Sequence, residues 1–184
     1  MMSWLTYPRT TNLWVKLNCV FFPLIATCIL LLWFFLSSKK ASIFGEGSVS
    51  DLVFGVFSIL PGFFLAGFSA AATFGNSRVD DEISDKRTTM PFEINGKTEW
   101  EVPSKRLIAI YLFYFLLILS LIVVIFAGIG KFLLSEPLIA SWSLQLRTCF
   151  SYVFLLVLIF GATSILFTIA QGMSFFVERM TRTD

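Results

Sequence analysis

Four long uncharged stretches dominate the pattern of hydrophobic and polar positions along the chain. They run over residues 17–38, 52–77, 107–130 and 148–177. Each exceeds the roughly 18 apolar residues that mark a helix long enough to cross a bilayer. The last stretch is longer than one crossing requires, so we expect it to tilt or to extend into water. The pattern predicts an all-α membrane protein with four transmembrane helices, the first of them retained rather than cleaved as a signal peptide.

Positively charged residues are distributed unevenly between the two sides of the predicted bundle. With four crossings, the termini and the loop 78–106 share one side, and that side holds Arg9, Lys16, Arg78, Lys86, Arg87, Lys97, Lys105, Arg106, Arg179 and Arg182. The other side holds Lys39, Lys40, Lys131 and Arg147. Cytoplasmic loops carry an excess of lysine and arginine. We therefore expect both termini and the 78–106 loop to be cytoplasmic.

This topology divides the chain into three parts. Residues 1–77 form an N-terminal tail with helices 1 and 2, residues 78–106 form the cytoplasmic loop, and residues 107–184 form helices 3 and 4 with a C-terminal tail.

Small side chains follow one side of the second apolar stretch when it is projected as a helix. They are Gly55, Ser58, Gly62, Ala66, Ser69, Thr73 and Asn76. Their spacing of three or four residues is typical of a left-handed packing seam. Helices in lipid associate through close backbone approach, so small residues gather at helix contacts. We favour a packing seam; the alternative is that the stripe lines a narrow path across an oligomer. Pro61 predicts a kink in either case.

A second polar stripe marks the fourth apolar stretch, at Gly161, Ser164, Thr168 and Gln171. Serine and threonine hydroxyls can bond to the backbone of their own helix, which makes them tolerable in lipid. The amide of Gln171 requires partners for its oxygen and its nitrogen. It is expected to face another helix, a water-filled space or, as we prefer, the cytoplasmic interface. No stretch carries a charged residue near its middle, which disfavours an ion-coupled transporter and leaves a passive pore open.

The loop 78–106 contains the turn motif Asn95-Gly96 within the segment 92–102, which predicts a small β-hairpin between helices 2 and 3. A two-residue turn would pair Phe92 with Glu99 and mix apolar and charged side chains on each face. A three-residue loop with a bulge would pair Met90 with Trp100 and keep the faces separate, so we favour this register.

An isolated hairpin is only marginally stable in water, so its apolar face must rest on another surface. In the favoured register that face carries Met90, Phe92, Trp100 and Val102. A neighbouring subunit and a cytosolic partner protein are both compatible with the pattern, and the headgroup layer is a third surface. These four residues are our candidate docking residues.

The composition argues against catalysis. The chain is 57% hydrophobic and 14% charged, whereas soluble domains have about 25% charged residues. It has no histidine, the commonest general base and metal ligand, and its three cysteines form neither a metal motif nor a disulfide framework. We therefore expect no enzymatic activity, no catalytic residue, no metal site, no cofactor and no direct nucleic-acid binding. The basic pairs Lys86–Arg87 and Lys105–Arg106 are candidate contacts for an anionic ligand, although the second pair also suits a membrane boundary.

The segment 60–76, followed by a polar loop and by the aromatic stretch 102–121, resembles small four-span bacterial and prophage membrane proteins. In layout the chain is similar to the membrane subunit of Kiwa-type anti-phage defence systems. The resemblance implies a multi-pass protein of the bacterial inner membrane that forms homo-oligomers and holds a cytosolic partner. We expect a non-catalytic sensor or scaffold in the lipid bilayer, with a tetramer as the working stoichiometry. The alternatives are a pore-forming effector gated by a ligand or partner and, third, a small-solute transporter.

Overall fold

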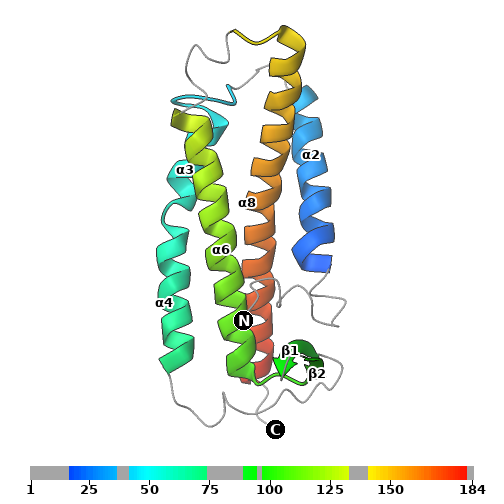
Figure 1. Cartoon of the computed structure of the whole chain (residues 1–184), viewed down its shortest axis with the longest axis vertical. Coiled ribbons are helices and arrows are strands. Elements are labelled where there is room, and N and C mark those ends of the chain that lie inside the picture. Colours follow the sequence, from blue (N-terminus) through cyan, green and yellow to red (C-terminus); the bar gives the residue numbers. More distant parts are fainter. Residues whose placement is uncertain (1–16, 37–41, 74–88, 95–96, 133–140, 182–184) are drawn as a thin grey trace.

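The computed structural model of the chain is an elongated bundle of helices with a small two-stranded sheet at one end (Figure 1). It describes residues 17–36, 42–73, 89–94, 97–132 and 141–181. We call the end of the bundle that carries the sheet the sheet end, and the opposite end the far end.

Two helices are long enough to cross a membrane and to extend beyond it. Helix α6 spans Lys105–Phe132 and α8 spans Leu144–Thr181, with 28 and 38 residues. At 1.5 Å per residue their lengths are about 42 and about 57 Å, against a hydrocarbon core of about 30 Å. Each begins after a serine: the Leu107 amide donates to Ser104 Oγ at 3.2 Å, and the Leu146 amide donates to Ser143 Oγ at 3.5 Å. These serine caps set where the helices start.

The second apolar stretch is helical but broken. Helix α3 (Val49–Phe57) and helix α4 (Leu60–Thr73) are separated at Ser58–Ile59. Pro61 has no N–H to donate to the Phe57 carbonyl, and its ring clashes with that carbonyl in a regular helix. The predicted kink is therefore present as a complete break. Ser48 caps α3 by accepting a hydrogen bond from the Asp51 amide at 3.2 Å.

Three segments are long and apolar enough to span a membrane: Val49–Thr73, Lys105–Phe132 and Leu144–Met173. The first predicted span is not among these three segments. It consists of a π-helical turn at Leu17–Phe21 (η2) followed by the 15-residue α-helix α2 (Phe22–Leu36). Pro23 stands in the first turn of α2 and cannot complete a regular α-helical hydrogen bond to the residues before it.

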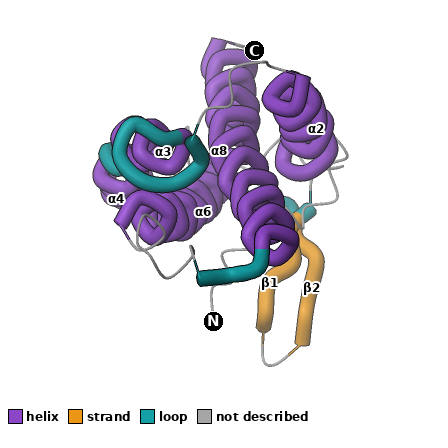
Figure 2. Tube along the Cα trace, turned by 90° about the horizontal axis from the view of Figure 1, so that it is seen from above, coloured by secondary structure: helices purple, strands orange, loops and turns teal. Residues whose placement is uncertain are grey.

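The helices are arranged in a row rather than around a central axis. Helix α6 lies between the α3–α4 pair and α8, and α2 packs on the other side of α8 (Figure 2). Val53, Phe57 and Phe64 of the broken helix are buried within the core that includes α6. Glycines allow close approach of α8 to α6, since a Cβ at Gly161 would lie 2.5 Å from Val123 Cγ2, and one at Gly172 would lie 2.5 Å from Leu112 Cδ2. These two contacts place α8 antiparallel to α6.

Helix α2 is joined to α8 by a buried polar contact. Thr27 Oγ1 donates to the Pro23 carbonyl at 2.7 Å and lies 3.1 Å from Thr163 Oγ1. The rings of Phe22 and Phe167 stack nearby at 6.0 Å. Both threonine hydroxyl groups are buried away from water, so each forms hydrogen bonds with the neighbouring helix or with the backbone of its own helix.

The sheet consists of β1 (Met90–Ile94) and β2 (Lys97–Glu101), paired antiparallel. Ile94 pairs with Lys97, Phe92 with Glu99, and Met90 with Glu101. The three-residue loop that we favoured from the alternation of side chains is therefore wrong, and the two-residue register is present. The alternation argument assumed that all apolar side chains share one face, whereas Met90 is fully buried and Trp100, on the opposite face, is exposed.

Candidate docking and assembly surfaces

The predicted small-residue stripe of α3 and α4 faces away from the rest of the chain. We call it the outward face; its described members are Gly55, Ser58, Gly62, Ala66, Ser69 and Thr73, and all six are exposed. Two positions of this face are displaced by two residues from a buried position, Gly55 from Val53 and Ala66 from Phe64. Two residues correspond to about 200° on an α-helix. Gly55 and Ala66 therefore point almost directly away from α6.

The glycines of α3–α4 show the same division between the two sides. A Cβ placed on Gly55 or Gly62 would meet nothing within 4 Å. A Cβ on Gly67, which lies on the inner side, would lie 2.6 Å from Phe113 Cε1 of α6. Close helix packing within the chain therefore uses Gly67, and the outward face is left without a helix against it in the described residues.

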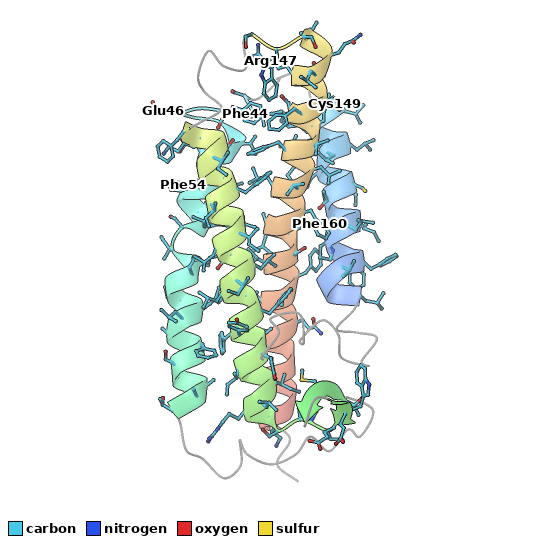
Figure 3. The ribbon with its side chains drawn as sticks, in the orientation of Figure 1. Phe44, Glu46, Phe54, Arg147, Cys149 and Phe160 are labelled. Carbon is cyan, nitrogen blue, oxygen red and sulfur yellow. The ribbon has the colours of Figure 1, made fainter. Side chains whose placement is uncertain are left out.

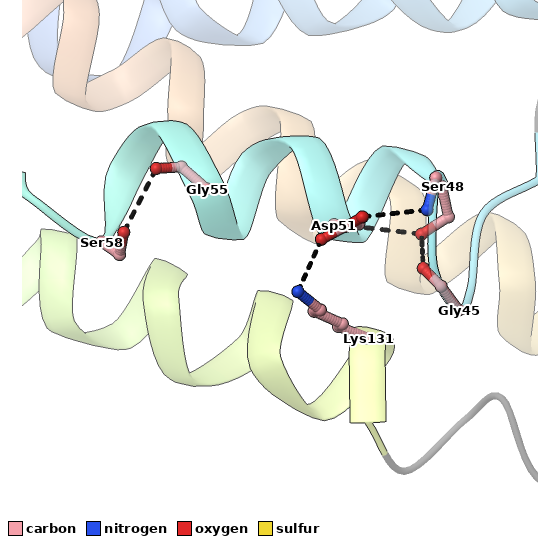
Figure 4. Close-up of polar contacts among 7 residues, drawn as sticks. Gly45, Ser48, Asp51, Gly55, Ser58 and Lys131 are labelled. Carbon is pink, nitrogen blue, oxygen red and sulfur yellow. Dashed lines mark hydrogen bonds and ion pairs between the residues drawn. The ribbon is translucent and has the colours of Figure 1, made fainter.

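Two of the hydroxyl groups of the outward face bond to their own helix. Ser58 Oγ donates to the Gly55 carbonyl at 3.2 Å (Figure 4), and Thr73 Oγ1 donates to the Ser69 carbonyl at 2.8 Å. Such bonds reduce the cost of hydroxyl groups in an apolar setting. The face thus combines small side chains with internally satisfied polar groups, which is typical of a helix–helix contact in lipid.

The helix break lies on this same exposed side. Gly55, Ser58 and Ile59 are exposed around it, and Pro61 cannot donate to the Phe57 carbonyl. Irregular backbone at membrane depth is found where protein covers it or where it lines a water-filled cavity. The break therefore requires either a covering protein surface or water.

The polar stripe of the fourth apolar stretch lies inside the chain. Ser164 and Thr168 are buried, with exposed fractions of 4% and 0%, and Gln171 is half-buried. The contacts of Gly161 with Val123 and of Gly172 with Leu112 place this stripe against α6. Ser164 Oγ has no hydrogen-bond partner among the described residues. The two predicted stripes therefore do not line a common path within one chain.

The candidate docking residues on the sheet are separated by the structure. Met90 is fully buried in the core, and Val102 packs against that core. Trp100 is 53% exposed, and the side chain of Phe92 lies outside the described residues. Met90 is thus an anchor of the sheet rather than a docking residue, and Trp100 is the member of the set that faces solvent.

The candidate anion contacts are only partly placed. Lys105 and Arg106 stand at the start of α6 and are half-buried. Lys86 and Arg87 lie outside the described residues. Among the residues that the structure describes, no three histidine, cysteine, aspartate or glutamate side chains are arranged to hold a metal ion.

Sequence reasoning missed an ion pair at the far end. Lys131 Nζ lies 2.8 Å from Asp51 Oδ1 (Figure 4) and 5.4 and 5.2 Å from the ring centroids of Phe54 and Phe132. The Gly47 amide donates to Asp51 Oδ2 at 2.9 Å. The available signal was that Asp51 and Lys131 are opposite charges at the ends of two spans predicted to meet the same side of the membrane. The pair ties the start of α3 to the end of α6.

The loop before α3 is held against α6 as well. The Gly45 amide donates to the Gly130 carbonyl at 3.3 Å, and Ser50 Oγ donates to the Ile43 carbonyl. Gly45 and Gly47 have φ angles of 91° and 68°, in the left-handed region that favours glycine. The far end is therefore closed by a compact polar turn.

Comparison of the chain with protein-family models, with curated proteins and with solved structures finds no match.

Proposed function

We propose that this chain is a non-catalytic membrane scaffold or sensor that assembles with copies of itself through the outward face and holds a cytosolic partner at the sheet end. The single observation that carries this proposal is the direction of the outward face. Its small residues are exposed on the side opposite the core, so the packing for which they are suited needs a second chain.

The proposed topology has four crossings with both termini in the cytoplasm. Together η2 and α2 cover Leu17–Leu36, which is close to the roughly 20 residues that one crossing requires. Helix α2 packs along α8, and its outer side exposes large apolar residues such as Ile29, Leu32 and Trp33. These side chains suit contact with lipid. The proposal includes the inner-membrane location that the resemblance to anti-phage membrane subunits implies.

The proposed assembly is tested by widening one position of the outward face. Gly62→Leu should dissociate the oligomer, because helix backbones then no longer approach closely, whereas Gly62→Ala should preserve it. Cys28→Leu provides a matched control, since Cys28 is a small exposed residue on α2. Subunit counts come from single-molecule photobleaching in nanodiscs. An unchanged count for Gly62→Leu would contradict assembly through this face.

The proposed docking role is tested at Trp100. Trp100→Ala should abolish co-purification of a cytosolic protein and leave membrane insertion and the oligomer intact. The control is Trp142→Ala, which removes an exposed tryptophan at the far end. Retained co-purification with Trp100→Ala would exclude this role of the sheet.

The second candidate function is a gated pore, and the exposed helix break favours it. Backbone at this depth also suits a water-filled path, and the hydroxyl groups of Ser58, Ser69 and Thr73 stand on the same side. In liposomes, Ser69→Leu should block ion leak without dissociating the oligomer if the face lines a pore. It should instead break the assembly if the face is a packing seam.

A further inference from the structure

Strand β2 presents an acidic and aromatic sequence to solvent. Glu99, Trp100 and Glu101 are all exposed, and Trp100 retains 53% of its accessible surface. In a strand, successive side chains point to opposite faces. Glu99 and Glu101 therefore lie on one face of the sheet and Trp100 on the other.

These side chains are held on a sheet that is fixed to the bundle. Met90 pairs with Glu101 across the sheet and is completely buried in the hydrophobic core. Pro103 is also buried directly after the strand. The exposed residues of β2 are thereby positioned before any ligand arrives, which lowers the ordering cost of binding.

One side of β2 has no strand beside it in the part of the chain that the structure describes. The sheet there has two strands, and they extend away from the helices (Figure 2). An exposed strand edge offers backbone N–H and C=O groups that accept a further strand, and the side chains on alternate positions then select its sequence.

We propose that this edge of β2 binds an extended basic segment of the cytosolic partner by adding it as a third strand. The segment carries lysine or arginine at two positions separated by one residue, opposite Glu99 and Glu101, and an apolar or aromatic residue between them, on the face of Trp100. Opposite charges and aromatic pairs on neighbouring strands are favourable. The inference rests on the proposed docking function and names the chemistry of the partner.

Charge favours this occupant over the membrane surface. The cytoplasmic leaflet is negatively charged, so the face of the sheet that carries Glu99 and Glu101 would be repelled by its headgroups. A cationic peptide segment is attracted to the same carboxylates. The acidic pattern therefore selects a protein ligand.

The test uses the full chain in nanodiscs of zwitterionic lipid and two short synthetic peptides. The first peptide has two arginines flanking a valine, with serine and threonine at its ends, and the second has glutamates in place of the arginines. Fluorescence anisotropy of labelled peptides measures affinity. The wild type should bind the arginine peptide, and the variant Glu99→Lys/Glu101→Lys should bind it at least about tenfold more weakly and prefer the glutamate peptide, because two attractive cross-strand pairs become repulsive. Glu46→Lys is the control, since this exposed carboxylate lies at the far end (Figure 3) and its variant should bind like the wild type.

Two results in nanodiscs would overturn the proposal. The first is equal affinity of the wild type for both peptides. The second is quenching of Trp100 by brominated lipids in a protein whose other four tryptophans are phenylalanine, because the sheet then rests on the membrane.

Co-purification of the cytosolic partner distinguishes a failure of the docking function from a failure of the third-strand proposal. If Trp100→Ala retains the partner, the docking function itself fails. If Trp100→Ala loses the partner while Glu99→Lys/Glu101→Lys retains it, docking stands and the basic third strand fails.

Discussion

Gly161→Ala is the most direct test of how closely α8 approaches α6. The added Cβ would lie 2.5 Å from Val123 Cγ2. Carbon atoms in favourable contact are about 3.5–4.0 Å apart, so one of the two groups must move by about 1 Å. Val123 is only 4% exposed, and a β-branched side chain in a helix has one strongly preferred rotamer. The helices themselves must therefore separate.

The expected change in the free energy of unfolding for Gly161→Ala is the sum of two opposing effects. Overpacking a well-packed core costs about 1–3 kcal/mol. Replacing a helical glycine by alanine returns up to about 1 kcal/mol of helix propensity. Gly62→Ala provides the reference in the detergent-solubilised monomer, because a Cβ there meets nothing within 4 Å in the same chain and the variant has only the second effect. The free energy of unfolding should therefore be lower for Gly161→Ala than for Gly62→Ala by about 1–3 kcal/mol.

The two variants are compared by titrating the folded protein in mild detergent with a denaturing detergent and following helix content by circular dichroism. Val123→Ala should destabilise the wild type by leaving a cavity. It should cost less in the Gly161→Ala background, where it removes the obstructing methyl group, so the two substitutions should be coupled. Equal unfolding midpoints for Gly161→Ala and Gly62→Ala would refute the close approach of α6 and α8.

Three further predictions concern polar groups and the helix break. Thr27→Val should lower the free energy of unfolding by about 0.5–1.5 kcal/mol, because it removes one buried hydrogen bond within α2 and one between α2 and α8. Ser164→Ala should cost less, since the Ser164 hydroxyl has no hydrogen-bond partner among the described residues, and chemical denaturation distinguishes the two variants. Lys131→Met should lower the thermal unfolding temperature at low salt, whereas Lys131→Arg should preserve the wild-type temperature. The difference between Lys131→Met and the wild type should shrink at high salt, because the ion pair with Asp51 is partly exposed. Pro61→Ala should close the helix break by supplying an N–H for the Phe57 carbonyl, and hydrogen exchange should then show new protection at residues 58–62; unchanged exchange there would mean that the proline does not cause the break.

The pattern of apolar residues predicted the helices well where the physics is local. Long uncharged stretches must form helices in an apolar environment, because each backbone polar group needs a partner within its own segment. Pro61 predicted a kink, because a missing N–H weakens a helix wherever it is packed, and the structure shows a break there. The two ends of α6, at Lys105 and Phe132, also lie within two residues of the predicted stretch 107–130, because charged residues and a serine cap mark them.

Features that depend on neighbours were less predictable. The favoured register of the sheet was wrong because the alternation of side chains was judged within the hairpin alone, while Met90 is buried against the bundle. The pairing of Asp51 with Lys131 joins residues eighty positions apart, and no local pattern links them. The candidate contacts Lys86 and Arg87 lie outside the described residues and stay a prediction.

The sequence by itself determined that the chain has long apolar helices, a distortion at Pro61 and two stripes of small or polar residues. Only the tertiary structure decided that the stripe of Gly55 and Gly62 points outward while that of Ser164 and Thr168 points inward. The reason is that helical periodicity fixes which residues share a face, whereas the direction of that face depends on which of the other faces packs better. In α3 and α4 the larger side chains of Val53, Phe57 and Phe64 fill the space against α6, and the small residues are left facing away from the chain.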